Sequence, residues 1–350
     1  MIALIAALIT AVQIGAPSPL YEPGADCPTG YEKGVSAMFA GAVGDTLIMA
    51  GGANFPDVPV SEGGRKRFYY EIFTRNNDYS PWTYNGMLPE STAYGMSVPL
   101  PDGLLCMGGT GFNGQSRQVF KLHTDGSIDR PWPELPAAIS EGAAAIADGK
   151  VYVAGGMSDG RPSATVWMLD LDTAGATWTP VAPLPSPVMQ PVMASSGGRL
   201  YLWYGFNTSP IEVSGQGFCY DPSTDQWSHI APHPTDGTFT GAVAATLPDG
   251  RIICTGGVDR EIFTEALGYT GEKVREYQRR PQAAYKFQQT LWVYDPATDA
   301  WHDAGSDAFS LARAGAGIAI TTKGVAVIEG EIKPGIRTPQ IAIIPFDSIH

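Results

Sequence analysis

Two opposite charges, Glu331 and Arg337, flank a short turn near the end of this 350-residue chain. Glu331 ends an apolar stretch that begins at Val325, and a Lys-Pro-Gly segment at 333–335 separates it from Arg337. Proline and glycine favour a tight turn there, which would place both charges on one rim. A carboxylate on a rigid strand end beside a cation suits general acid–base catalysis, whereas an ordinary surface ion pair that stabilises the loop is the alternative interpretation.

An internal repeat predicts the scaffold that holds this motif. Short apolar runs that end in a glycine turn begin at Leu47, Leu104, Val151, Leu200, Ile252 and Val325. Five copies continue into an alternating strand, a turn, and a further strand that starts at Trp82, Trp132, Trp178, Trp227 or Trp301. A period near 50 residues with four short strands per copy predicts an all-β, six-bladed kelch-type β-propeller, with the tryptophans packed between blades.

The sixth copy supplies only three strands, so we expect residues before Tyr31 to complete its blade and close the ring. Residues 17–350 then form a single domain. The apolar, uncharged segment 1–16 resembles a signal peptide, which predicts a periplasmic or secreted protein; a buried strand or helix and a cytoplasmic protein are the alternative.

Composition limits the partners and cofactors of the chain. The net charge of −13 makes nucleic acid and anionic membranes poor partners. Only His229 and His233 lie close together among five histidines, so no metal site is expected. Cys106 and Cys254 occupy equivalent places in two copies and should lie in the core, and we expect no disulfide framework.

One segment, 258–285, breaks the strand pattern. Its apolar residues recur every three or four positions among many charges, which predicts one or two short helices in the fifth blade. Such an insertion is either a solvated decoration, or a lid or subunit contact beside the site. A homodimer is therefore one expectation.

The motif at 330–338 resembles an element of the sialic acid mutarotases, also called N-acetylneuraminate epimerases. That family carries Gly-Glu-x-Lys-Pro-Gly-x-Arg-Thr, matched here by Gly330, Glu331, Lys333, Pro334, Gly335, Arg337 and Thr338. Segments 256–258 and 291–301 resemble the blade before the glutamate, and Ala50–Ala53, Lys66 and Tyr94-Gly95 resemble the two blades after it. Because those two blades come first here, the chain resembles a cyclically permuted branch over residues 35–346. Phe55-Pro56 and the 57–67 loop depart from the family pattern.

The resemblance implies an enzyme that interconverts the α and β anomers of N-acetylneuraminate by acid–base ring opening, with no cofactor. It implies Glu331 as the catalytic base and Arg337 as its partner, able to bind the carboxylate of the sugar. Lys333 is a candidate second cation. Further candidate substrate contacts lie in or beside loops that follow blade strands: Asn54, Tyr94, Arg161 and Asn207.

Three other functions compete with this interpretation. A kelch-type binding module would need no chemistry at Glu331. A sialidase is also six-bladed but needs repeated aspartate boxes and an arginine triad, which the sequence lacks. A copper-radical sugar oxidase needs two histidine and two tyrosine ligands from separate blades, and the histidine positions argue against it.

Overall fold

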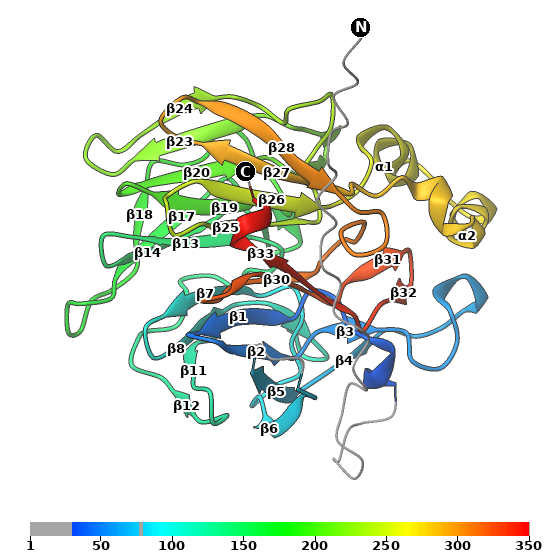
Figure 1. Cartoon of the computed structure of the whole chain (residues 1–350), viewed down its shortest axis with the longest axis horizontal. Coiled ribbons are helices and arrows are strands. Elements are labelled where there is room, and N and C mark those ends of the chain that lie inside the picture. The colour runs from blue at the N-terminus through cyan, green and yellow to red at the C-terminus, as the bar shows by residue number, and fades with distance from the viewer. Residues whose placement is uncertain (1–29, 77–79, 350) are drawn as a thin grey trace, which may run out of the picture.

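Six β-sheets surround a central axis in the computed structural model, which describes residues 30–76 and 80–349 (Figure 1). This arrangement confirms the predicted six-bladed propeller. The predicted leader at 1–16, the strand expected before Tyr31 and Cys27 lie outside the described residues. No helix among the described residues is long and apolar enough to cross a bilayer.

The first three blades are antiparallel sheets of four strands each. Blade 1 contains β1 (Phe39–Val43), β2 (Thr46–Ala50), β5 (Glu71–Asn76) and β6 (Thr83–Met87). Blade 2 contains β7 (Met96–Leu100), β8 (Gly103–Met107), β11 (Val119–Leu122) and β12 (Ile128–Asp129). Blade 3 contains β13 (Ala143–Ala147), β14 (Lys150–Ala154), β17 (Val166–Asp170) and β18 (Thr179–Val181).

The last three blades complete the ring. Blade 4 contains β19 (Val192–Ser196), β20 (Arg199–Trp203), β23 (Gly217–Asp221) and β24 (Gln226–Ile230). Blade 5 contains β25 (Ala242–Thr246), β26 (Ile252–Gly256), β27 (Thr290–Asp295) and β28 (Ala300–Ser306). Blade 6 shows three strands among the described residues: β29 (Gly317–Ile320), β30 (Gly324–Ile328) and β33 (Ile341–Pro345). Its inner strand β29 packs beside β1 and joins the last blade to the first.

After its second strand, each blade except the fifth adds a short hairpin on the same side of the ring. The hairpins are β3 (Ala53–Asn54) with β4 (Arg67–Phe68), β9 (Thr110–Gly111) with β10 (Gly114–Gln115), β15 (Met157–Ser158) with β16 (Arg161–Pro162), β21 (Phe206–Thr208) with β22 (Ile211–Val213), and β31 (Glu331–Lys333) with β32 (Ile336–Arg337). Short 3₁₀ helices occur at Tyr31–Lys33 (η1), Val60–Glu62 (η2), Gln282–Tyr285 (η3) and Phe346–Ser348 (η4).

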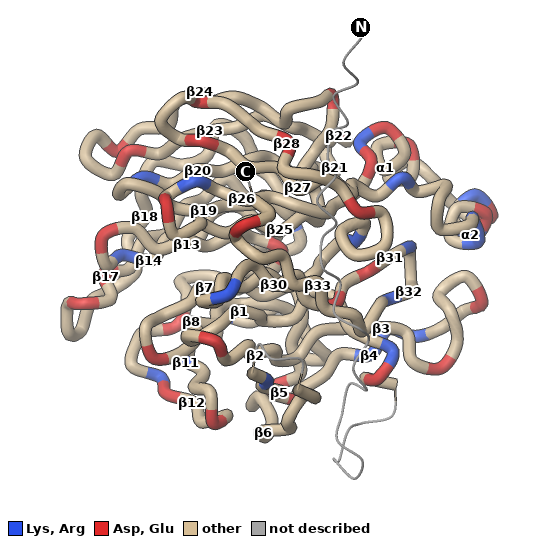
Figure 2. The backbone as a smooth tube through the Cα atoms, in the orientation of Figure 1, with Lys and Arg blue, Asp and Glu red and all other residues tan. Residues whose placement is uncertain are grey.

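In blade 5 the hairpin is replaced by helices α1 (Arg260–Leu267) and α2 (Glu272–Arg279), which project from one side of the ring next to β31 and β32 (Figure 1). The Asp259 side chain accepts a hydrogen bond from the Ile262 backbone at 2.9 Å and so begins α1. The predicted helical insertion is therefore confirmed. Figure 2 shows most charged residues in outer turns and on α2, and few on the inner strands.

The tryptophans and the aspartate turns link neighbouring blades. The Trp178 indole donates to the Pro133 carbonyl at 3.0 Å, and the Trp227 indole donates to the Ala182 carbonyl at 2.9 Å. The Ala182 backbone N–H in turn donates to the Asp225 carboxylate at 2.7 Å. The tryptophans thus have the structural role predicted for them. Cys106 and Cys254 are fully buried in β8 and β26, as predicted, and are free thiols.

A ring of six residues with positive φ surrounds one end of the axis, one residue per blade: Ala37, Tyr94, Glu141, Gln190, Gly241 and Gly315. We call this set the mouth ring. Five backbone hydrogen bonds of 2.7–2.8 Å join successive members, including the bond from Ala37 N–H to the Gly315 carbonyl, which connects blades 1 and 6. The mouth ring therefore fixes the blades against one another at the end where the hairpins lie.

Candidate active site

Glu331 and Arg337 face each other across the β31–β32 hairpin. Their backbones are paired in register, and an Arg337 guanidinium nitrogen forms an ion pair with the Glu331 carboxylate. The Arg337 side chain is 3% exposed, whereas the Glu331 side chain is 24% exposed. The pair is thus more than a surface salt bridge, because a nearly buried cation holds a carboxylate that still reaches solvent.

The turn between the two residues depends on glycine. Gly335 has φ +83°, and a Cβ at this position would lie 2.4 Å from the Val60 side chain. Only glycine accepts this backbone conformation at low cost while η2 packs so closely. The Lys-Pro-Gly segment therefore sets the register that brings Glu331 opposite Arg337.

Two residues of blade 1 hold the Arg337 guanidinium. Its Nε donates to the Ser36 hydroxyl at 3.0 Å, and the guanidinium carbon lies 5.4 Å from the centre of the Phe55 ring. Stacking on an aromatic face and a fixed hydrogen bond limit the rotation of the side chain. Phe55 belongs to the segment that the sequence analysis singled out as departing from the family pattern, and it lies beside the guanidinium of the predicted site.

A second glutamate anchors the start of the hairpin. Glu329 is fully buried, and an oxygen of its carboxyl group accepts the Val35 backbone N–H at 2.7 Å, while Gly330 N–H donates to the Val35 carbonyl at 3.0 Å. Burial raises the pKa of Glu329 to about 8, against the opposing effects of the Val35 N–H and the nearby Arg313 charge. These contacts tie β31 to the segment that precedes blade 1.

Glu331 and Arg337 line a cavity of about 280 Å³ at the mouth of the propeller. All six members of the mouth ring line it as well, together with Ser36 and, from the insertion, Val258 and Phe263. This volume is close to the lower end of the range for small-molecule sites, about 300–1,000 Å³. The cavity thus has room for a ligand of a few rings or one sugar.

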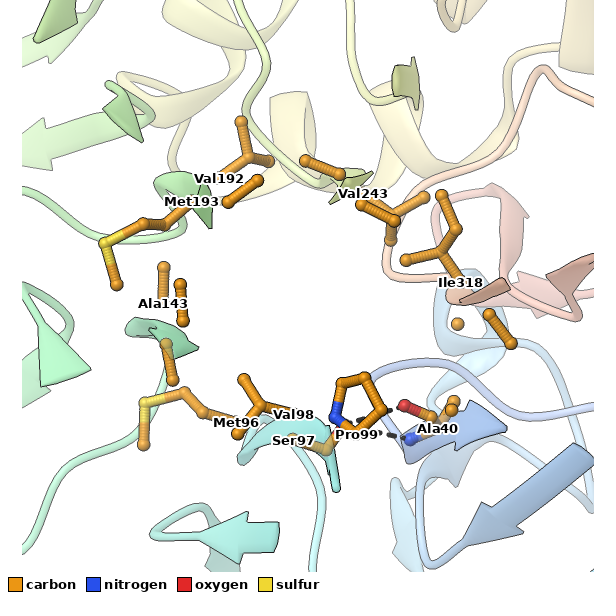
Figure 3. A pocket seen from close by; sticks show the side chains of 18 of the residues that line it. Ala40, Met96, Ser97, Val98, Pro99, Ala143, Val192, Met193, Val243 and Ile318 are labelled. Carbon is orange, nitrogen blue, oxygen red and sulfur yellow. Dashed lines mark hydrogen bonds between the residues drawn. The ribbon is translucent and has the colours of Figure 1, made fainter. Parts of the chain in front are cut away.

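The mouth cavity continues into an apolar channel of about 430 Å³ along the axis. The two spaces share one lining residue from each blade, namely Met38, Gly95, Gly142, Pro191, Ala242 and Ala316. Figure 3 shows the channel surrounded by small aliphatic side chains such as Ala143, Val192, Val243 and Ile318. The charged residues that line the two spaces are therefore at the mouth, and the channel below it is lined by uncharged residues.

The insertion borders the mouth on the side of Glu331. Phe263 of α1 packs against Phe206 of β21, with ring centres 5.2 Å apart. Burial raises the pKa of Tyr277 and of Tyr285, and the negative charge of Glu331 raises both further. The insertion therefore lies beside the site, as expected of a lid, and not at a distance from it as a purely solvated insertion would.

Four of the other predicted contacts lie outside the cavity lining. Lys333 donates to the Arg280 carbonyl at 2.8 Å and so ties the hairpin to the insertion. The buried Asn54 amide donates to the Gly30 and Gly34 carbonyls at 2.7 and 2.8 Å, which are structural bonds. Arg161 is exposed on its hairpin, and Asn207 donates to the Pro187 carbonyl at 3.4 Å. Tyr94, in contrast, lines the cavity.

Sequence reasoning missed several cavity residues, above all Ser36, Glu141 and Gln190. The Gln190 amide donates to the Glu141 carboxylate at 2.8 Å, so a second carboxylate occupies blade 3 of the mouth. A signal exists for Glu141 and Gln190: mouth-ring residues recur with nearly the spacing of the glycine pairs, so aligning the six copies would have selected these positions. Within residues 30–76 and 80–349, no cluster of His, Cys, Asp or Glu is arranged to hold a metal ion.

The fold and site together define a kelch-type six-bladed propeller with a carboxylate–arginine pair at its mouth. A family model described as N-acetylneuraminate epimerase matches residues 132–349. Because this match covers more than half of the chain, the chain belongs to the N-acetylneuraminate epimerase family. The matched range leaves out blade 1 and nearly all of blade 2, the part whose order in the chain should differ in a cyclically permuted member.

Individual relatives agree with this assignment. The N-acetylneuraminate epimerase of Brucella melitensis is 31% identical over 233 residues, which are 61% of this chain and 58% of that protein. The enzyme of the same name from Yersinia enterocolitica is 30% identical over 226 residues, 60% of this chain and 56% of the relative. The solved structure of YjhT matches with a TM-score of 0.53 and 28% identity, over 60% of this chain and 64% of that one. The matches thus span less than two thirds of these relatives.

Proposed function

We propose that the protein is a mutarotase that interconverts the α and β anomers of N-acetylneuraminate. One observation carries the proposal: in a chain of the N-acetylneuraminate epimerase family, the Glu331–Arg337 pair lines a sugar-sized cavity at the mouth of the ring. The names of the relatives support the substrate.

The geometry supports a division of labour between the two residues. Arg337 is held by Ser36 and Phe55, so its guanidinium is oriented to bind the carboxylate of the sugar acid. Glu331 is partly exposed and negatively charged, so it can accept the proton of the anomeric hydroxyl. Removal of that proton opens the ring, rotation about the adjacent bond exposes the other face of the keto carbon, and closure gives the other anomer.

The test follows anomer equilibration of freshly dissolved N-acetylneuraminate by proton NMR, with and without the protein. Glu331→Gln preserves the shape and hydrogen bonding of the side chain but removes the base, so the catalysed rate should fall about 10²–10⁴-fold. Glu212→Gln on the β21–β22 hairpin, which lies outside the cavity lining, is the matched control and should keep the wild-type rate.

A Glu331→Gln protein that equilibrates the anomers at the catalysed wild-type rate would remove Glu331 as the base, and a wild-type protein that does not accelerate equilibration would return the chain to the alternative of a binding module. Export remains a prediction from segment 1–16, and N-terminal sequencing of the protein recovered from its native cells tests it.

A further inference from the structure

Tyr94 shares the positive φ of the mouth ring and is its one aromatic member. Its φ is +60°, a region in which a bulky aromatic residue is strained. Backbone hydrogen bonds on both sides hold it there: its N–H donates to the Ala37 carbonyl at 2.7 Å, and its carbonyl accepts the Glu141 N–H at 2.8 Å. Strain of this kind persists where the surroundings enforce it, which is common at functional sites.

Lys66, on the blade 1 hairpin loop, contacts the Tyr94 hydroxyl. The ammonium nitrogen lies 2.7 Å from the phenol oxygen and 4.8 Å from the centre of the ring. The same ammonium lies 5.9 Å from the centre of the Phe55 ring, whose centre is 5.4 Å from the Arg337 guanidinium. Lys66 and Arg337 thus flank Phe55; Arg337 lines the cavity, and Lys66 reaches it through the cavity residue Tyr94.

The direction of the hydrogen bond between Lys66 and Tyr94 follows from chemistry. A lysine ammonium can only donate, so the phenol oxygen must accept. The phenol then keeps its own proton for another acceptor, and no acceptor for it is present among the described residues. Tyr94 lines the cavity, so this O–H is available as a donor to an occupant of the cavity, with the Lys66 ammonium bound to the same oxygen.

Other polar groups of the cavity are less suited to donate a proton. Arg337 does not release a proton at physiological pH. The Ser36 hydroxyl already accepts from Arg337 and donates to the Ala53 carbonyl, and Glu141 is a carboxylate that accepts from Gln190.

We propose that Tyr94 is the general acid of the reaction and that Lys66 is the residue that positions and activates it; this inference rests on the mutarotase function proposed above. As Glu331 takes the anomeric hydroxyl proton, those O–H electrons form the carbonyl. The bond between the anomeric carbon and the ring oxygen breaks, and its electrons take the proton from the Tyr94 hydroxyl. Ring closure on the other face returns one proton to Tyr94 and one to the anomeric oxygen, so the net change is isomerisation alone.

The test compares steady-state anomer exchange in Tyr94→Phe, Lys66→Met and Lys66→Arg with the wild-type protein. Tyr94→Phe should lower kcat about 10²-fold or more with KM nearly unchanged, because only the proton is lost. Lys66→Met should lower kcat about 10-fold, and Lys66→Arg should restore most of it, since a guanidinium also donates to the phenol. The double variant should be no slower than Tyr94→Phe alone, because both changes remove one function.

Matched controls are Tyr269→Phe on the insertion and Lys121→Met, whose ammonium pairs with Asp102 away from the cavity. Both should keep the wild-type kcat, and thermal melting of every variant should give the wild-type Tm if the fold is intact.

Three outcomes overturn the assignment. Wild-type kcat in Tyr94→Phe removes Tyr94 as the acid. A raised KM with unchanged kcat in Lys66→Met assigns Lys66 to binding the sugar carboxylate instead. A fall of kcat in Glu141→Gln that exceeds the fall in Tyr94→Phe moves the acid to blade 3. A wild-type protein without activity overturns the mutarotase function itself, whereas these three results leave that function standing.

Discussion

Glu329→Gln should change how the stability of the protein depends on pH. The Glu329 carboxyl is fully buried and its pKa is raised to about 8, from an ordinary value of 4.5, chiefly by burial. Between these two pH values the folded protein keeps a proton that the unfolded chain has lost. The free energy of unfolding of the wild-type protein therefore falls as pH rises through this window, and glutamine, which does not titrate, removes that loss.

The size of the effect follows from the width of the window. Each pH unit removes about 1.4 kcal/mol, so the change from pH 5 to 8 is of the order of 4 kcal/mol. Unfolding entropy is about 2 cal/mol/K per residue, so in a chain of this length 4 kcal/mol corresponds to about 5 °C in Tm. The Tm of Glu329→Gln relative to wild type should thus increase by about 5 °C between pH 5 and pH 8.

Thermal melts of both proteins at pH 5 and pH 8 measure this difference. The relevant quantity is how the Tm difference between variant and wild type changes from pH 5 to pH 8. Any constant cost of placing an amide beside Val35 and Arg313 is the same at both pH values and therefore cancels. Glu90→Gln, at an exposed position, is the control and should show no such change. An equal Tm difference at both pH values would refute the idea that Glu329 is buried as a neutral acid.

Four other changes have defined outcomes. Arg337→Ala should cost about 2–5 kcal/mol in kcat/KM for anomer exchange. Arg337→Lys should recover little of this loss, because an ammonium lacks the planar, two-pronged set of donors of a guanidinium. A fully active lysine variant would contradict this reasoning. Replacing 258–285 by a short glycine-containing turn should leave a folded propeller, seen by circular dichroism, with a raised KM; unchanged kinetics and gel-filtration size would reduce the insertion to decoration. Burial lowers the pKa of His233 to about 4, so between pH 6.5 and 4 the unfolded chain gains a proton that the folded protein does not, and stability falls. His233→Asn should lessen this loss of stability, which thermal melts at pH 7 and 4.5 measure. An equal fall of Tm in the variant and the wild-type protein would argue against this role of His233. Deletion through Val35 should abolish a cooperative melt, because Val35 holds Glu329 and Gly330, and a well-folded product contradicts that role.

The fold was predictable because its signals are local and repeated. Each glycine turn has a steric cause, as at Gly51, where φ is +68° and a Cβ would lie 2.3 Å from the Thr92 carbonyl. Five of the eight tryptophans recur at the same place in five of the copies. The Glu331–Arg337 pair was visible for a similar reason, since one short turn determines its geometry and the other copies have uncharged residues at the position of Glu331.

The rest of the site depends on contacts between blades, which local patterns do not reveal. Lys66 meets Tyr94 because the curvature of the ring brings a loop of blade 1 over the start of blade 2. Asn54 was a reasonable candidate as a polar residue after a strand, yet its side chain turns inward to cap backbone carbonyls and accepts the Tyr69 hydroxyl at 2.8 Å. The direction of a side chain at a strand end depends on its contacts with residues distant in the sequence, and the neighbouring sequence does not reveal these contacts.

The mouth ring has a mechanical consequence. Its five hydrogen bonds form a hoop, and among the described residues no sixth bond joins Gln190 of blade 4 to Gly241 of blade 5. At this point blades 4 and 5 are held by the packing of their inner strands β19 and β25 and not by a hydrogen bond of the ring. Helix α1 belongs to blade 5, and its Phe263 packs against Phe206 of blade 4, so α1 connects the two blades. A shift of α1 would therefore disturb the contact between blades 4 and 5, the one pair of neighbouring mouth-ring members that no backbone hydrogen bond joins among the described residues.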